Sequence, residues 1–112
     1  MQRSASISVG ARRYQIRLLP DAEFDELLAS SGQPDVTGIK AFTCYDSQLI
    51  AVRDRMQPDH KRELLIHELV HAAIEDSGFI QDERTEALVS AIAPRLSALL
   101  PDISRLYLEL SI

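Results

Sequence analysis

The sequence predicts a single α+β domain spanning residues 1–112, in which a small β-sheet packs on helices. In the first half of the chain apolar residues alternate with polar ones, as in strands, whereas in the second half they recur every three or four residues, as in helices. The length of 112 residues and the hydrophobic content of 46% suit one modest core. Neither a repeat nor a linker divides the chain, so we expect one domain.

The first half is expected to form two β-hairpins with a helix between them. Residues that alternate on either side of Gly10 predict the first hairpin, from Ile7 to Leu18. Pro20-Asp21 begins a helix that stops near Ser31-Gly32. The elements that follow in chain order are a loop at Gln33-Pro34-Asp35, a β segment at residues 39–45, a turn at Asp46-Ser47 and a β segment at residues 48–52.

The second half is expected to be helical. Pro58-Asp59 marks the start of one helix, with Asp59 as its cap, and Ser77-Gly78 marks its end. Asp82 can cap the next helix, and Pro94 should kink or restart it, because proline lacks a backbone donor and crowds the preceding turn. The last segment, residues 103–110, fits either a helix or a strand. The inner side of the second helix is expected to carry Leu88, Val89, Ile92, Leu96, Leu99 and Leu100.

Charge and composition argue against several classes of function. A net charge of -5 and scattered basic residues do not suit a nucleic-acid-binding surface. The N-terminus lacks the apolar segment of a signal peptide, and no apolar run approaches the roughly 20 residues that cross a bilayer. We therefore expect a cytoplasmic protein with neither a nucleic-acid nor a membrane partner. Cys44, the one cysteine, can form no internal disulfide and is expected to be an inert thiol.

The most informative stretch is His67-Glu68-Leu69-Val70-His71, a His-Glu-x-x-His pentapeptide in a helix that is expected to be covered on most sides. Histidines four residues apart project from the same helical face and can share one metal ion. Glu68 lies about 100° around the axis from His67, so it flanks the metal as a general base must. The alternative is that both histidines are core residues with backbone or carboxylate partners.

A catalytic zinc site needs a third protein ligand. Ser77 stands where a third histidine six residues after the motif would be. Glu75 lies two turns from His67, about 12 Å along the axis, which is too far for both to bind one ion. The ligand is therefore expected from the next helix, which folds back antiparallel and carries Glu83 and Glu86 one turn apart. The spacing does not decide which of the two glutamates is the ligand. Either one can also be present only to stabilise the helix, because acidic residues in a first turn interact favourably with the helix dipole.

The motif, the Ser-Gly turn after it and a following helix that reads Glu-x-x-x-x-Ala-x-x-Pro-x-Leu resemble the small phage and prophage zinc peptidases related to the ImmA/IrrE group, within the wider gluzincin class. The resemblance covers residues 38–100. It implies a minimal gluzincin-like core, in which a small sheet packs on the motif helix and on an antiparallel helix after it. It also implies a glutamate ligand on that second helix and a polar residue one turn later that supports a histidine. When the family pattern is aligned on Ala91 and Pro94, the ligand falls at Glu86 and the supporting residue at Ser90. Many gluzincins carry Asp at the supporting position, so Ser90 is a departure from the family pattern.

The resemblance therefore implies a zinc metallopeptidase, a hydrolase of the cytoplasm, or of the host cytoplasm if phage-encoded. His67, His71 and Glu86 would hold Zn²⁺, and Glu68 would be the general base for a zinc-activated water that attacks a peptide carbonyl. The expected partner is a peptide or protein substrate, which includes a host or repressor protein. The alternative is a phage or prophage module that keeps the zinc site and acts by docking on a host or repressor protein.

The electrophile that this class of peptidase uses is not placed by the sequence. Its candidates are His60, Tyr45 and Tyr107. We expect His60 at the surface and both tyrosines in buried aromatic packing.

Overall fold

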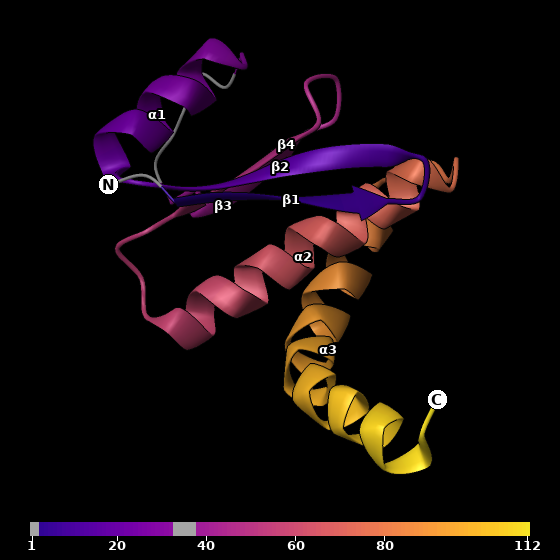
Figure 1. Cartoon of the computed structure of the whole chain (residues 1–112). Helices are drawn as coiled ribbons and strands as arrows, with labels where there is room; N and C mark the ends of the chain where they lie inside the picture. The colour runs from indigo at the N-terminus through magenta and orange to yellow at the C-terminus, as the bar shows by residue number, and fades with distance from the viewer. Residues whose placement is uncertain (1–2, 33–37) are drawn as a thin grey trace.

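The structure is a computed structural model that describes residues 3–32 and 38–112, with a mixed α+β architecture. Helix α1 lies on one face of a sheet and α2 on the other, and α3 packs on the side of α2 away from the sheet (Figure 1). This arrangement confirms the α+β prediction. The elements in chain order are β1 (Arg3–Val9), β2 (Arg12–Leu19), α1 (Asp21–Ser30), β3 (Ala41–Cys44), β4 (Leu49–Arg53), α2 (Pro58–Asp76) and α3 (Glu83–Leu110).

The sheet has four strands in the order β1-β2-β4-β3. Both expected hairpins are present, since β1 pairs with β2 and β3 pairs with β4, each antiparallel. The two hairpins join through the parallel pair β2 and β4, in which Ile16 lies opposite Ile50. The short strand β3 is therefore an edge of the sheet, and it lies against α2. The loop expected at Gln33-Pro34-Asp35 lies outside the described residues.

Side chains that alternate along the central strands build a core on each face of the sheet. Ile50 and Val52 of β4 point to the α2 side, where they meet Ala72, while Ala51 between them points to the α1 side. The α2 side is completed by Tyr14 and Ile16 of β2 and the α1 side by Leu19, Phe24 and Leu28. Because both faces are covered, the site-bearing helix α2 is held on a layer that is itself packed from behind.

Arg53, at the end of β4, joins α1 to the sheet. Its guanidinium donates to Asp21 at 3.0 Å, to Asp25 at 2.6 Å and to the Ile39 carbonyl at 2.7 Å. It also lies 4.1 Å from the centre of the Phe24 ring, a cation–π distance. With 6% of its surface exposed, this arginine is buried, and a buried charge needs such partners.

The two C-terminal helices begin differently. The carboxylate of Asp82 accepts from two backbone N–H groups of the first turn of α3, so the predicted cap is confirmed. The cap expected at Asp59 is wrong, because Gln57 occupies that position and Pro58 is the first helical residue. Proline has no N–H to satisfy there, so the need for a side-chain cap is smaller. Asp59 instead pairs with Arg62 at 3.1 Å.

The expected burial of both helices needs correction. Within α2 only Ala72 is fully buried, so this helix is half-covered rather than covered on most sides. The expectation that Leu88, Leu99 and Leu100 face inward is also wrong, because they are 56%, 50% and 43% exposed. For Leu99 and Leu100 the reason is length: α3 has 28 residues and α2 has 19, so the C-terminal part of α3 extends past its partner (Figure 1). Leu88 lies near the start of α3, to one side of the buried Val89 and Ala93.

Helix α3 runs without a restart through Pro94 and Pro101, and the segment 103–110 that the sequence left open is helical. This continuity produces a helix that is long and apolar enough to cross a membrane by length and composition alone. Only 11% of the apolar window that meets this criterion is buried. The N-terminal turns of the same helix pack on α2 and contribute to the site described below.

Candidate metal centre

Helix α2 presents His67 and His71 on one face. They are four residues apart, and their ring centres lie 4.9 Å from each other. Both side chains are largely buried, at 19% and 12% exposure. The helix itself is anchored by its opposite face, because Leu65 and Leu69 pack against the core of the sheet. The spacing of the pair is therefore fixed by the backbone of a packed helix.

Helix α3 brings Glu86 to this pair. One carboxylate oxygen, Oε1, lies 3.0 Å from Nε2 of His67, and the other, Oε2, lies 2.7 Å from Nε2 of His71. The donor atoms of these three residues all lie within 4.8 Å of one another. Ser90, one turn later, reaches Oε1 of Glu86 at 3.4 Å, whereas Glu83 lies exposed in the first turn and outside this group. The structure thus brings together His67, His71 and Glu86 and leaves Glu83 apart.

Glu68 lies beside the three donors and is not one of them. The hydroxyl of Thr43, on the edge strand β3, donates to Oε1 of Glu68 at 2.8 Å. The other oxygen, Oε2, is 4.0 Å from Nε2 of His67. Burial raises the pKa of the Glu68 carboxyl above its ordinary value, and the Thr43 hydrogen bond and the neighbouring histidines offset part of that rise. The Glu68 carboxyl group is therefore fixed in position by Thr43 and takes up a proton more readily than an exposed glutamate does.

Gln81, in the turn before α3, connects His71 to its surroundings. Its side-chain oxygen lies 2.5 Å from Nδ1 of His71, so a proton on Nδ1 would leave the lone pair of Nε2, on the side of Glu86, available to a metal ion. The side-chain nitrogen of Gln81 donates to the hydroxyl of Tyr45 at 3.0 Å, to a carboxylate oxygen of Glu75 at 3.1 Å and to the His71 carbonyl at 3.3 Å. Partners of this kind orient metal-binding histidines and set their tautomer.

Neither Thr43 nor Gln81 was identified from the sequence as part of the site. Thr43 sits in an alternating β segment whose register against α2 no local pattern reveals. Gln81 stands next to the predicted cap Asp82, where a polar residue is ordinary. The missing signal in both cases is tertiary: one contact spans 25 residues and the other 10.

The donors and Glu68 open into a hollow of about 340 Å³ between α2, α3 and the edge strand β3. One wall is polar and carries the four residues described above, and the other is apolar and includes Leu28 of α1. The remaining lining residues are Ile39, Ala41, Phe42, Thr43 and Tyr45.

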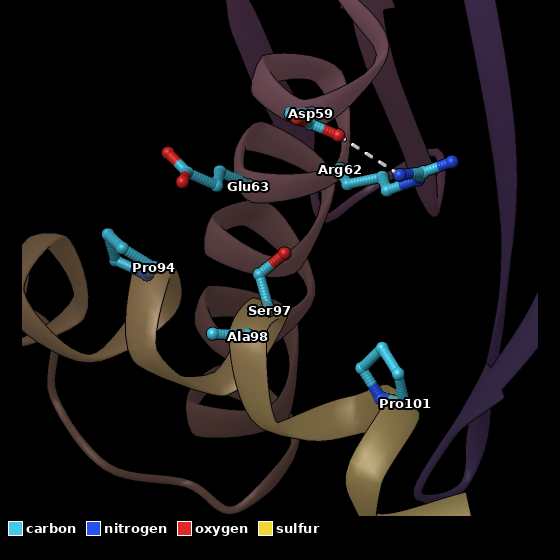
Figure 2. A pocket seen from close by; sticks show the side chains of 7 residues that line it. All are labelled: Asp59, Arg62, Glu63, Pro94, Ser97, Ala98 and Pro101. Atoms are coloured by element: carbon cyan, nitrogen blue, oxygen red, sulfur yellow. Dashed lines mark hydrogen bonds and ion pairs between the residues drawn. The ribbon is translucent and has the colours of Figure 1, made fainter.

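A second hollow, of about 370 Å³, lies where the first turns of α2 face the middle of α3 (Figure 2). Its lining includes Pro94, Pro101 and Ala98, and its charged pair, Asp59 and Arg62, is already joined by an ion pair (Figure 2). Because no group of metal-binding side chains among the described residues converges there, we place the candidate site in the hollow beside Glu68.

The three candidates for an electrophile have different positions. Tyr45 lines the hollow, and burial raises the pKa of its phenol, whose oxygen accepts from Gln81. His60 lies outside this hollow, in a smaller one that it shares with His67. The buried packing expected for Tyr107 is wrong, because the residue is 55% exposed near the end of α3. Of the three, only Tyr45 lines the hollow of the candidate site.

The donor set fits zinc. Two imidazole nitrogens and one carboxylate oxygen form the His₂Glu combination of catalytic zinc sites, and these sites keep a further position for water or substrate. Glu86 is 59% exposed, so the group is open on the solvent side. Comparison of the chain with protein-family models, curated proteins and solved structures gives no match. The chemistry assigned to the site therefore rests on its geometry and on the resemblance of its motif.

Proposed function

We propose that this chain is a zinc-dependent metallopeptidase of the phage and prophage type, with a minimal gluzincin-like core. The observation that carries the proposal is the convergence of His67, His71 and Glu86 beside a held, largely buried Glu68. Two imidazoles and a carboxylate hold the metal in this scheme. Glu68 remains outside the donor group and is available as a base.

Glu68 performs the proton transfers of the proposed reaction. When bound, zinc supplies a Lewis acid that polarises the peptide carbonyl and acidifies the attacking water. Glu68 accepts the proton of that water and then passes it to the leaving amine. Its raised pKa suits both steps, because a base that must also release its proton works best when its pKa approaches the working pH. Thr43 holds one oxygen of the carboxyl group and so fixes the direction of the other.

The substrate in this proposal is a peptide in extended form. Strand β3 is an edge of the sheet and lines the hollow, so its outer backbone groups can pair with an added strand. A peptide paired there would run past Glu68, since Thr43 of the same strand contacts that residue. The apolar wall that includes Leu28 and Phe42 would then receive an apolar side chain of the substrate. A host or repressor protein with a flexible segment offers such a substrate.

The first experiment measures the metal. Protein expressed with zinc supplied should carry about one zinc per chain by elemental analysis, and His67→Ala or His71→Ala should lose most of it. A folded wild-type protein without zinc would overturn the proposal at its first step.

The second experiment separates catalysis from docking. Glu68→Gln should keep zinc and fold but lose hydrolysis, because an amide cannot accept the proton of the water. Glu63→Gln, an exposed glutamate on the same helix, is the matched control and should cleave like the wild type. Extended peptides and candidate phage or host proteins are incubated with each variant, and products are identified by mass spectrometry. Equal cleavage by Glu68→Gln would remove Glu68 from the mechanism. Stable capture of a partner without cleavage by any variant would favour the docking module.

A further inference from the structure

Helix α3 carries an exposed apolar ridge along its length. We define this ridge by Leu88, Ile92, Leu99, Ile103, Leu106 and Leu110, which recur at intervals that keep them on one side of an α-helix. Leu88, Leu99, Leu106 and Leu110 are between 43% and 63% exposed. In a globular protein the apolar side of a helix normally packs against the core. An apolar side that is exposed instead commonly marks a surface that binds a partner.

The fold explains why the ridge is uncovered. Among elements with substantial contacts, α3 touches only α2, and its C-terminal part extends beyond that helix and away from the sheet (Figure 1). The two residues that α3 buries, Val89 and Ala93, lie to one side of the ridge. The ridge therefore belongs to the flank of α3 that the chain does not use for its own core.

Charge argues against a membrane as the partner. The last turns of α3 carry Asp102, Glu109 and the single cation Arg105, which is already paired with Glu109 at 2.9 Å. Such a net acidic segment is not attracted to an anionic lipid surface. Full insertion of α3 would also move charged side chains of this segment out of water, which is unfavourable. The residues of the ridge itself are all uncharged, so an apolar protein surface suits it better.

The area of the ridge fits a second copy of this chain. A fully exposed large apolar residue presents on the order of 200 Å². The four exposed ridge leucines, with Leu100 and Tyr107 beside them at 43% and 55% exposure, then present roughly 600 Å² per chain. A stable interface of standard size uses roughly 600 to 1,000 Å² per partner, and these side chains reach the lower end of that range.

We propose that this chain forms a homodimer in which the α3 ridges of two copies pack against each other across a two-fold axis. A two-fold interface uses the same patch on both partners, so one continuous apolar ridge is sufficient. Glu86 projects from a different side of α3, toward His67 and His71, so pairing through the ridge leaves the hollow beside Glu68 open. The proposal stands independently of the metal and of peptidase activity.

The molecular mass in solution tests the proposal. Light scattering coupled to size-exclusion chromatography, repeated over a range of protein concentrations, should give twice the chain mass of 12.5 kDa. Leu106→Glu should shift the protein to the monomer. The matched control is Leu108→Glu, which makes the same change two residues away on the opposite side of α3, at a leucine that is 82% exposed. This variant should remain a dimer.

Two further measurements keep the result decisive. Leu110→Glu, in the last turn of α3, lies far from the packing with α2 and should also give a monomer, while circular dichroism shows that each variant keeps its helices. A wild-type protein that is monomeric at every concentration overturns the proposal, whether or not it binds vesicles of neutral phosphatidylcholine. Equal dissociation by Leu106→Glu and Leu108→Glu overturns it as well, because the interface would then not be the ridge.

Discussion

Replacing Gln81 by Leu should weaken zinc binding without removing any zinc ligand. The substitution keeps the approximate size of the side chain but removes the oxygen that lies 2.5 Å from Nδ1 of His71. Losing such a partner typically costs about 10- to 100-fold in metal affinity, or about 1.4 to 2.7 kcal/mol. The loss arises because the imidazole is then free to rotate and to place its proton on Nε2, the nitrogen that faces Glu86. Zinc affinity is measured by competition with a chromophoric chelator at fixed pH.

Tyr45→Phe is the control for this measurement. It removes the hydroxyl to which Gln81 donates at 3.0 Å, but it leaves the contact between Gln81 and His71 in place. Zinc affinity should therefore stay close to that of the wild type, and circular dichroism of both metal-free variants should show an intact fold. A Gln81→Leu protein that binds zinc as tightly as the wild type would refute the role we assign to this contact.

Three further outcomes are expected from the same site. Glu86→Ala should lose zinc affinity by a large factor, whereas Glu83→Ala should cost only about 0.3 to 1 kcal/mol of helix stability. Zinc titration measures the first effect and urea unfolding the second. The reverse result would make Glu83, one turn earlier, the ligand. Chelation should lower the melting temperature, and acid should weaken zinc binding because protons compete for the imidazoles; equal melting with and without chelator would contradict this coupling. In metal-free protein, Glu68→Gln should be more stable than the wild type at neutral pH. Burial raises the pKa of Glu68 above 4.5, so its favourable contribution is present below that value and is lost as the pH rises through the folded-state pKa. Urea unfolding of both proteins should thus give a gap that opens from acid to neutral pH, and a gap that stays constant would contradict the burial argument.

The parts of the site that lie within one helix could be predicted from the sequence. The spacing of His67 and His71 is fixed by helical geometry, and it needs only a helix to become a shared site. The position of Glu86 depends on how two helices meet. The spacing of residues left the choice between Glu83 and Glu86 open, and the resemblance to the peptidase family pointed to Glu86. The structure brings Glu86 between the two histidines, while its role as a ligand stays a prediction.

The features that sequence analysis missed depend on tertiary register and on the length of neighbouring elements. Thr43 reaches Glu68 because β3 is the outer strand of the sheet, and that order follows from the parallel pairing of β2 with β4. The periodicity of α3 identified an apolar side but could not show where α2 ends. For this reason Leu99 and Leu100 were expected inside and are found exposed.

Arg53 attaches to the sheet the helix that contributes to the apolar wall of the hollow. In the proposed function this wall would select the substrate, and residues from other helices would act on it. It attaches α1 to the sheet through Asp21 and Asp25, and α1 contributes Leu28 to the apolar wall. The donor residues, in contrast, come from α2 and α3 on the other side of the sheet. Changes in α1 can therefore alter the shape of the wall while the spacing of His67, His71 and Glu86 is maintained. If the proposed peptidase function holds, such a division would allow substitutions in α1 to change the accepted peptides while the reaction stays the same.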